Sequence, residues 1–151
     1  MQKVTVIGVG KLGLCFALTL EKNGFDIVGV DLDQNYIVSL NEKSFSSDEP
    51  GVNECLINAE NFTVTKDLKI GLDHSDIIFL FVATPSLLNG KYDHSQIDRV
   101  VSKIRKFGKN KIEKRLIIGC TTMPSYCDTL EEKLFSYGYQ ISYNPEFIAQ
   151  G

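Results

Sequence analysis

The chain has 151 residues, of which 43% are hydrophobic, and this is enough material for one domain with a substantial core. Its formal net charge of −3 at pH 7 argues against a protein that binds nucleic acid or an acidic membrane through a basic surface. No stretch approaches the roughly 20 apolar residues that cross a bilayer, and the N-terminus enters a strand-like run without a signal-peptide pattern.

The first half of the chain alternates strand-like and helix-like segments. The β-branched run 3–8 predicts a buried strand, and the run 25–31 predicts a second one. Between them a helix is expected to end at Gly24, since glycine is typical just after a helix C-terminus. Asp33 is positioned to cap a short helix after the second strand. Beyond a polar loop, Pro50 opens a predicted helix over 51–60, and 61–65 predicts a third strand.

The second half continues the alternation. The unbroken apolar run 76–82 is typical of a central parallel strand. The patterns that follow predict, in order, a helix over 95–107, a strand over 115–120, a helix over 126–137 and a strand over 139–143. Six strands joined by helices predict an α/β fold, a doubly wound parallel sheet of the Rossmann type with strand order 3-2-1-4-5-6. This sheet would make residues 1–151 one complete domain.

The segment between the first strand and the first helix has the spacing GxGxxG. In this pattern Gly8 allows the tight turn, Gly10 lets a pyrophosphate approach the backbone, and Gly13 lets the helix pack closely on the sheet. Asp31 ends the second strand, where a carboxylate accepts hydrogen bonds from both adenosine ribose hydroxyls and repels the extra phosphate of NADP. The sequence therefore predicts NAD as the cofactor rather than NADP. The expected contacts come from Gly8, Val9, Gly10, Lys11, Leu12, Gly13 and Asp31, with Lys11 either beside the pyrophosphate or in solvent.

Three proline-containing motifs follow the last three predicted strands. They are VATPS at 82–86, TTMPS at 121–125 and NPEF at 144–147. Open parallel sheets bind their ligands at the carboxyl ends of the strands, which is where all three motifs lie. Proline alone often ends a strand, but three such corners with adjacent polar side chains favour a functional site at this edge.

Together with EPG at 49–51, these motifs resemble the N-terminal NAD-binding domain of the UDP-glucose/GDP-mannose dehydrogenase family over essentially the whole chain. The resemblance implies that a central helix and a UDP-sugar-binding domain follow residue 151. It also implies that the full-length enzyme oxidises the C6 alcohol of a UDP-sugar, with UDP-glucose as the expected substrate, to a uronic acid for polysaccharide synthesis in two NAD-dependent steps. The family's nucleophilic cysteine lies in the second half, so these 151 residues alone are expected to be inactive. A cytoplasmic homodimer or larger assembly is expected of the full-length protein.

The same resemblance assigns roles to individual residues. By position, Glu146 matches a glutamate that works with a water in the acid/base and hydrolysis steps, and Thr122 matches its partner threonine. The resemblance therefore implies catalytic roles for Glu146 and Thr122, further cofactor contacts from Thr84, Pro85, Thr122 and Gln150, and substrate contacts from Glu146, Phe147 and Gln150. No metal is expected.

The sequence departs from the family pattern in several places. Lys11-Leu12 replaces an aromatic-valine pair, Tyr36 replaces a common Lys or Arg, and Ala149-Gln150 replaces a larger residue followed by glutamate. We expect Tyr36 to remove one phosphate or ribose contact. Two alternatives remain open, a stand-alone NAD(H)-binding regulatory module and a β-hydroxyacid dehydrogenase-like cofactor domain; NPEF argues against the second.

Other conspicuous groups have simpler interpretations. The four cysteines lack CxxC or metal-type spacing and are interpreted as reduced packing residues of a cytoplasmic protein. His74 and His94 fall in polar contexts and are expected at the surface. The basic run Lys103 to Arg115 is interpreted as a helix end favoured by its dipole, followed by a solvated loop, rather than as a binding patch.

Overall fold

A computed structural model describes residues 1–146 of the chain. Its six strands are hydrogen-bonded in the order β3-β2-β1-β4-β5-β6, which confirms the predicted doubly wound parallel sheet. The chain divides into two compact units, Met1–Ile78 and Phe79–Gly151. Strand β4 (Ile77–Leu80) carries the chain from the first unit into the second.

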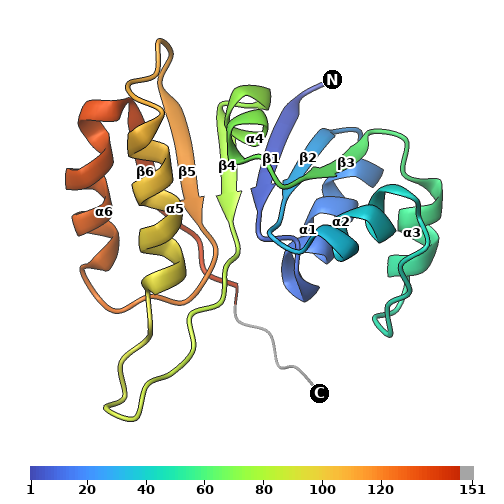
Figure 1. Ribbon diagram of the computed structural model, residues 1–151, viewed down its shortest axis with the longest axis horizontal. Coiled ribbons are helices and arrows are strands. Elements are labelled where there is room, and N and C mark those ends of the chain that lie inside the picture. The colour runs from blue at the N-terminus through green and yellow to red at the C-terminus, as the bar shows by residue number, and fades with distance from the viewer. Residues whose placement is uncertain (147–151) are drawn as a thin grey trace. The chain divides into compact units, whose positions relative to one another are not determined.

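The first unit contains three of the strands and four helices (Figure 1). In chain order these are β1 (Lys3–Ile7), α1 (Lys11–Lys22), β2 (Asp26–Val30), α2 (Gln34–Asn41), α3 (Val52–Asn58), β3 (Phe62–Thr65) and α4 (Leu68–His74). The strands pair in parallel with Val6 opposite Gly29 and Gly29 opposite Val64. The predicted caps are confirmed, because the Asp33 side chain accepts a hydrogen bond at the start of α2 and Gly24, with φ +87°, follows the end of α1.

Helix α4 was not predicted from the sequence. The Asp67 side chain caps it by accepting from the Lys69 N–H at 2.8 Å. Leu68, Gly71 and Leu72 form its buried face. The buried Thr5 hydroxyl of β1 donates to the Gly71 carbonyl at 2.7 Å. A side chain at Gly71 would lie within 2.5 Å of a Val30 methyl, so glycine lets this helix pack directly on β1 and β2.

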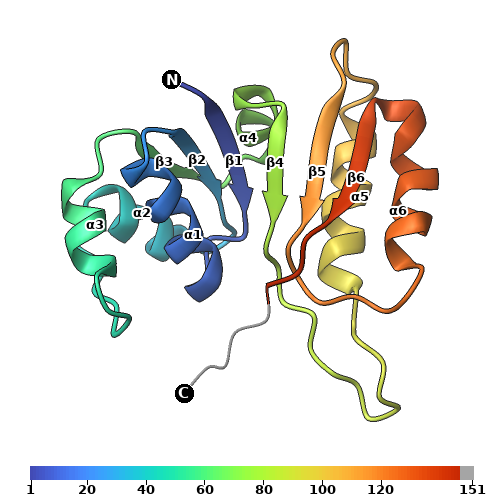
Figure 2. The ribbon, with the colours of Figure 1, turned by 180° about the vertical axis from the view of Figure 1, so that it is seen from behind.

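The second unit contains two helices and two further strands. These elements are α5 (Ser95–Lys106), β5 (Lys114–Ile118), α6 (Tyr126–Leu134), the 3₁₀ turn η1 (Phe135–Tyr137) and β6 (Tyr139–Tyr143). Figures 1 and 2 show α5 and α6 on the same side of β5 and β6. The single helix predicted over 126–137 is thus a shorter helix followed by a 3₁₀ turn, which ends at Gly138 with φ +82°.

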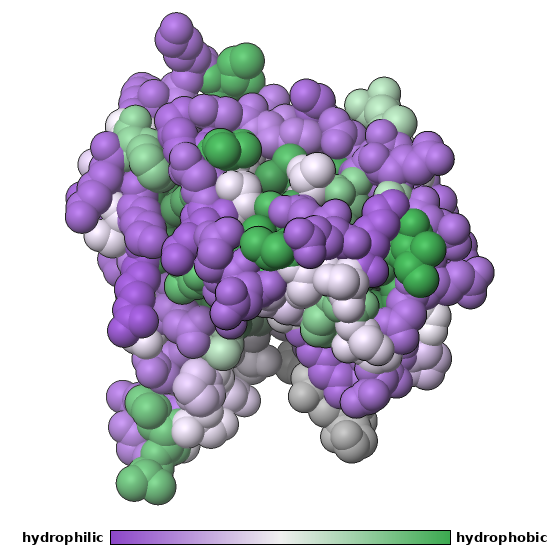
Figure 3. All heavy atoms as spheres, turned by 45° about the vertical axis from the view of Figure 1, so that its right-hand side comes forward, coloured by the Kyte–Doolittle hydropathy of each residue, from purple (hydrophilic) through white to green (hydrophobic). Residues whose placement is uncertain are grey.

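The face shown in Figure 3 carries hydrophilic side chains with scattered hydrophobic ones among them. Lys103, Arg105 and Lys106 lie in the last turn of α5, where the helix dipole favours cations, as the sequence indicated. Within residues 1–146, no helix combines the length and the apolar character needed to cross a membrane. In the same residues, no three histidine, cysteine or acidic side chains cluster as metal ligands would.

Candidate functional site

The glycine-rich turn joins β1 to α1. Gly8 has φ +85°, a conformation that glycine adopts without strain, and its N–H donates to the Val30 carbonyl at 2.8 Å. Gly10 is the N-cap of α1 and provides no side chain to the first-turn N–H groups. A Cβ built on Gly10 meets no atom within 4 Å, so the protein's own packing does not require glycine here. This open face beside a helix N-terminus fits the approach of a pyrophosphate.

Val9, at the centre of this turn, is fixed on three sides. Its N–H donates to Asp31 Oδ2 at 3.2 Å, and its carbonyl accepts from the Tyr36 hydroxyl at 2.8 Å. Its fully buried side chain lies over Gly29, where an added Cβ would approach a Val9 methyl at 2.8 Å. The turn is therefore held in one conformation before any ligand binds, and a binding site formed in advance loses less entropy on binding.

The Asp31 carboxylate lies beside this turn, as the sequence predicted. In addition to the Val9 N–H, it accepts the N–H groups of Leu32 at 2.7 Å and Asp33 at 3.2 Å, both on Oδ1. A carboxylate has about four acceptor positions, so these three bonds leave room for a ribose hydroxyl. The neighbouring Asp33 carboxylate is also negative, and it caps α2 through the Tyr36 N–H at 3.0 Å. Two carboxylates at this point disfavour the 2′-phosphate of NADP.

Tyr36 has a role that the sequence did not reveal. We expected its replacement of a basic residue to remove a contact, whereas its hydroxyl holds the glycine-rich turn through Val9. Its ring packs edge-on against Phe45, with centroids 5.0 Å apart. Burial, with a smaller contribution from the Asp31 charge, raises the pKa of Tyr36 to about 12, so the hydroxyl remains a donor at neutral pH. The available signal was a tyrosine in the first turn of a helix that begins three residues after Asp31.

Lys11 is paired with an acidic side chain from the loop between α2 and α3. Its Nζ lies 2.6 Å from Glu49 Oε1, and the side chains are 50% and 35% exposed. The half-exposed Lys11 side chain agrees with the predicted solvent position, the ion pair with Glu49 was not predicted, and the position beside the pyrophosphate stays a prediction. The pair lines a pocket of about 400 Å³ that also includes Gly10, Tyr36 and Phe45. The motif EPG, which the sequence singled out, thus supplies the partner of the first residue of α1.

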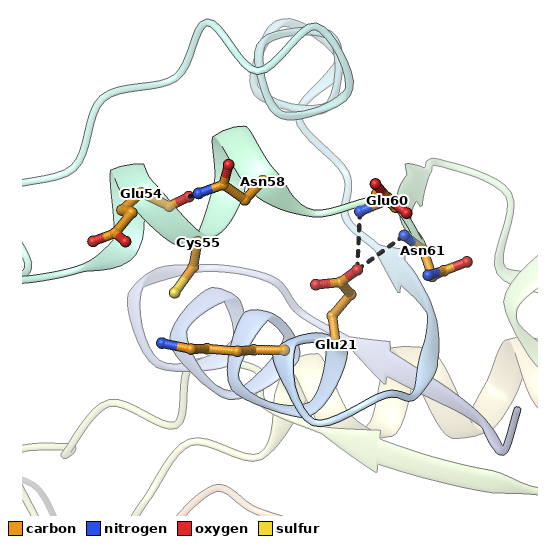
Figure 4. Close-up of a pocket in the computed structure, with 7 residues that line it drawn as sticks. Glu21, Glu54, Cys55, Asn58, Glu60 and Asn61 are labelled. Carbon is orange, nitrogen blue, oxygen red and sulfur yellow. Dashed lines mark hydrogen bonds between the residues drawn. The ribbon is translucent and has the colours of Figure 1, made fainter.

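A second pocket of the first unit has a structural explanation. It measures about 290 Å³ and lies between the ends of α1 and α3 (Figure 4). Glu21 Oε1 accepts the N–H groups of Glu60 at 2.9 Å and Asn61 at 3.0 Å. This carboxylate therefore fastens the entry to β3 onto α1, which gives Glu21 a structural role in the pocket.

The motif VATPS leads into a short hairpin in the second unit. Ser86 forms an isolated antiparallel bridge with Tyr92, and the Pro85 carbonyl accepts the Asp93 N–H at 2.8 Å. Thr84, four residues after the end of β4 at Leu80, is half-buried, and Pro85 is exposed. Both residues lie past the carboxyl end of β4, where the sequence placed them.

The motifs TTMPS and NPEF lie next to one another in the second unit. The N–H groups of Asn144 and Glu146 donate to the carbonyls of Ile118 at 3.0 Å and Gly119 at 3.2 Å. The Thr122 N–H donates to the Tyr143 hydroxyl at 3.3 Å. Thr122 is buried, whereas Glu146 is exposed, and its backbone is fixed by the bond to Gly119. Phe147 and Gln150, the other residues assigned to substrate or cofactor, lie outside the described residues.

His94 and Cys127 complete the surroundings of Thr122. His94 Nε2 accepts the Met123 N–H at 3.2 Å, and its ring stacks on Tyr126 with centroids 3.7 Å apart. Burial lowers the pKa of His94, which keeps Nε2 free to accept, although Asp98 and Asp93 oppose the shift. The Thr122 hydroxyl lies 3.8 Å from Cys127 Sγ. The expectation that both histidines are simple surface residues was wrong, since the 11%-exposed His74 side chain also bonds a backbone carbonyl, that of Asp26.

Comparisons with known proteins show the family of this chain. Residues 2–151 match the model of the UDP-glucose/GDP-mannose dehydrogenase family, NAD binding domain. The chain is 32% identical to the uncharacterized protein MJ1054 of Methanocaldococcus jannaschii, covering 99% of this chain and 17% of that protein. It is 26% identical to UDP-glucose 6-dehydrogenase TuaD of Bacillus subtilis, covering 100% and 34%.

The fold is also shared with solved structures. A UDP-glucose dehydrogenase from the archaeon Pyrobaculum islandicum has a TM-score of 0.86 at 22% identity, covering 100% of this chain and 37% of that one, and this shows the shared fold. The chain thus spans about a third of these two dehydrogenases. Since the family model covers almost every residue, the chain belongs to the UDP-glucose/GDP-mannose dehydrogenase family and corresponds to its NAD-binding domain.

Proposed function

We propose that this chain is the NAD-binding domain of a nucleotide-sugar 6-dehydrogenase. The whole enzyme would oxidise the C6 alcohol of a UDP-sugar, most directly UDP-glucose, to the uronic acid. The observation that carries this proposal is the adjacency of two motifs in the second unit. Glu146 and Asn144 bond the chain just before TTMPS, and Tyr143 bonds Thr122 within it. These bonds fix the Glu146 backbone next to the segment that leads to the buried Thr122, which supports a joint role of the carboxylate and the hydroxyl in orienting a water for proton transfer.

The first unit supplies the cofactor contacts in this proposal. The uncapped N–H groups at the start of α1 would bind the pyrophosphate over the open face of Gly10, and Asp31 would accept a ribose hydroxyl. NAD would supply the hydride acceptor. Thr84 and Pro85 would line the cofactor site in the second unit, with Thr122 and Gln150.

The catalytic roles fall to the second unit. Glu146 would act with a water as general base, and Thr122 would position that water through its hydroxyl. Phe147 and Gln150 would contact the sugar nucleotide. A central helix, a UDP-sugar-binding domain and the nucleophilic cysteine would come from the part of the protein beyond these 151 residues. The free thiols of Cys15, Cys55, Cys120 and Cys127 support a cytoplasmic location, and a homodimer is the expected assembly.

Cofactor preference tests the foundation of this proposal. In calorimetric titrations, the chain should bind NAD in preference to NADP, and Asp31→Asn should weaken NAD by about 10- to 100-fold, the range for a lost hydrogen bond to a charged group. Asp33→Asn is the matched control, because it removes the same charge two residues away while asparagine still caps α2. Equal affinity of the wild type for NAD and NADP would sink the assignment of Asp31.

Substrate identity requires the full-length protein. UDP-glucose, GDP-mannose and UDP-N-acetylmannosamine should be compared as substrates, with NADH formation followed at 340 nm. We expect UDP-glucose to give the highest kcat/KM, and Glu146→Gln to lower kcat by about 10²-fold or more. Higher kcat/KM with GDP-mannose would transfer the assignment to the other branch of the family. The 151-residue chain by itself should release no uronate.

A further inference from the structure

Lys11 and Glu49 connect the glycine-rich turn to a loop that is distant in sequence. Lys11 is the first residue of α1 and directly follows Gly10, whose open face is where the pyrophosphate would lie. Its ammonium contacts Glu49 at 2.6 Å, and both side chains retain access to solvent. Gly10, Lys11 and Glu49 line the same pocket, so an anion over the turn would lie within reach of the lysine.

The backbone around Glu49 is fixed, whereas the lysine side chain can rotate. Ser47 and Asn53 exchange two hydrogen bonds, from the Ser47 N–H at 2.8 Å and from Asn53 Nδ2 at 2.9 Å. The Glu49 N–H donates to the Ser47 hydroxyl at 3.1 Å, and the Glu49 carbonyl accepts the Val52 N–H at 3.3 Å. Lysine has four rotatable side-chain bonds. The loop that carries Glu49 is therefore held in place, and the long Lys11 side chain can turn from Glu49 to another anion.

Lys11 lies among negative charges in the structure. A hydrogen bond and the negative charge of Glu49 raise the pKa of Lys11, and Asp48 adds a smaller contribution. A dinucleotide pyrophosphate brings two negative charges to the helix N-terminus, where the dipole already favours anions. One ammonium between a carboxylate and a pyrophosphate can satisfy only one of them fully.

We propose that Lys11 exchanges Glu49 for a pyrophosphate oxygen when the dinucleotide binds, so that Glu49 competes with the cofactor for this lysine. The inference rests on the proposed NAD site and adds a determinant of cofactor affinity to it. Glu49 thereby sets the affinity below the value that the turn alone would give.

A double-mutant cycle on NAD affinity tests the exchange. Glu49→Gln should raise the affinity about two- to fivefold, the range expected of an exposed ion pair. Lys11→Met should lower it by a similar factor, since the phosphate contact is lost. In the Lys11→Met background, Glu49→Gln should have no effect on the NAD affinity, because the lysine for which Glu49 and the pyrophosphate compete is absent. Asp73→Asn, which breaks the exposed ion pair with Lys69, is the control for a general change in charge and should leave the affinity unaltered.

Other outcomes overturn the inference in distinguishable ways. A loss of NAD affinity in Glu49→Gln would mean that the Lys11–Glu49 pair stays intact and stabilises the NAD-bound state. An equal gain with and without Lys11 would mean that Glu49 only repels the phosphates through space. An unchanged affinity in Lys11→Met would mean that the lysine never reaches them. If the wild type binds no NAD, the proposed function itself fails, and this inference fails with it.

Discussion

Replacing Tyr36 by phenylalanine tests whether the glycine-rich turn is held in advance of cofactor binding. The change removes the 2.8 Å hydrogen bond to the Val9 carbonyl but keeps the ring that packs edge-on against Phe45. Because Val9 is fully buried, water does not readily replace the donor that its carbonyl loses. A neutral hydrogen bond of this kind contributes about 0.5–1.5 kcal/mol. The second anchor of Val9, the carboxylate of Asp31, remains.

This free energy can be lost in two ways. If the turn keeps its conformation, the whole of it is lost from stability, and Tm falls by about 2–4 °C for each kcal/mol. If the turn relaxes, the stability falls less, but cofactor binding must restore the turn, and the NAD affinity falls by up to about tenfold. We expect the second outcome, because the buried Val9 lies between the partly exposed Gly8 and the exposed Gly10, and glycine changes its backbone conformation at little cost.

Calorimetry, thermal denaturation and amide hydrogen exchange separate these cases. Tyr36→Phe should bind NAD more weakly and exchange the Val9 and Gly10 amide protons faster than the wild type, with a small change in Tm. Tyr137→Phe, which removes a hydroxyl from η1 in the second unit, is the matched control. Wild-type affinity together with unchanged exchange at Val9 would refute the role assigned to Tyr36.

Three further outcomes follow from the same geometry. Gly10→Ala should leave Tm unchanged but weaken NAD at least tenfold in calorimetry, because its Cβ meets no protein atom and fills the space for the pyrophosphate; equal affinity would show that the phosphates lie elsewhere. Gly119→Ala should lower the free energy of unfolding in urea by about 1–3 kcal/mol, because its Cβ would overlap the ring of Phe81. The folded-state pKa of Tyr36, raised to about 12 from 10.0, makes its contribution to stability complete below pH 10 and lost as the pH rises towards 12. Between pH 10 and 12 the free energy of unfolding should therefore fall less in Tyr36→Phe than in the wild type. Parallel plots of this free energy against pH for the two proteins would contradict the assignment.

The strands, the glycine-rich turn and the acid at the end of the second strand were predictable because their signals are local. Continuous β-branched runs, a GxGxxG turn and an acid at the end of the next strand lie within short windows, and the right-handed crossover rule then orders the sheet. The caps at Asp33 and Gly24 were predictable for the same reason. In contrast, the seven residues of α4 carried too weak a pattern, since so short a helix depends on burial against β1 and β2.

The contacts that shape the site were decided only by the tertiary structure. Tyr36 reaches a backbone carbonyl of the glycine-rich turn, Lys11 reaches a glutamate from another loop, and His94 reaches the N–H of Met123. Each joins segments far apart in the chain, and two of the three acceptors or donors are backbone groups that every residue possesses. No pattern of residue types identifies such a partner, because the hydrogen bond depends on where the folded chain places the two atoms. The sequence by itself determined the glycine-rich turn and the acid beside it, and folding determined which side chains hold that turn in place.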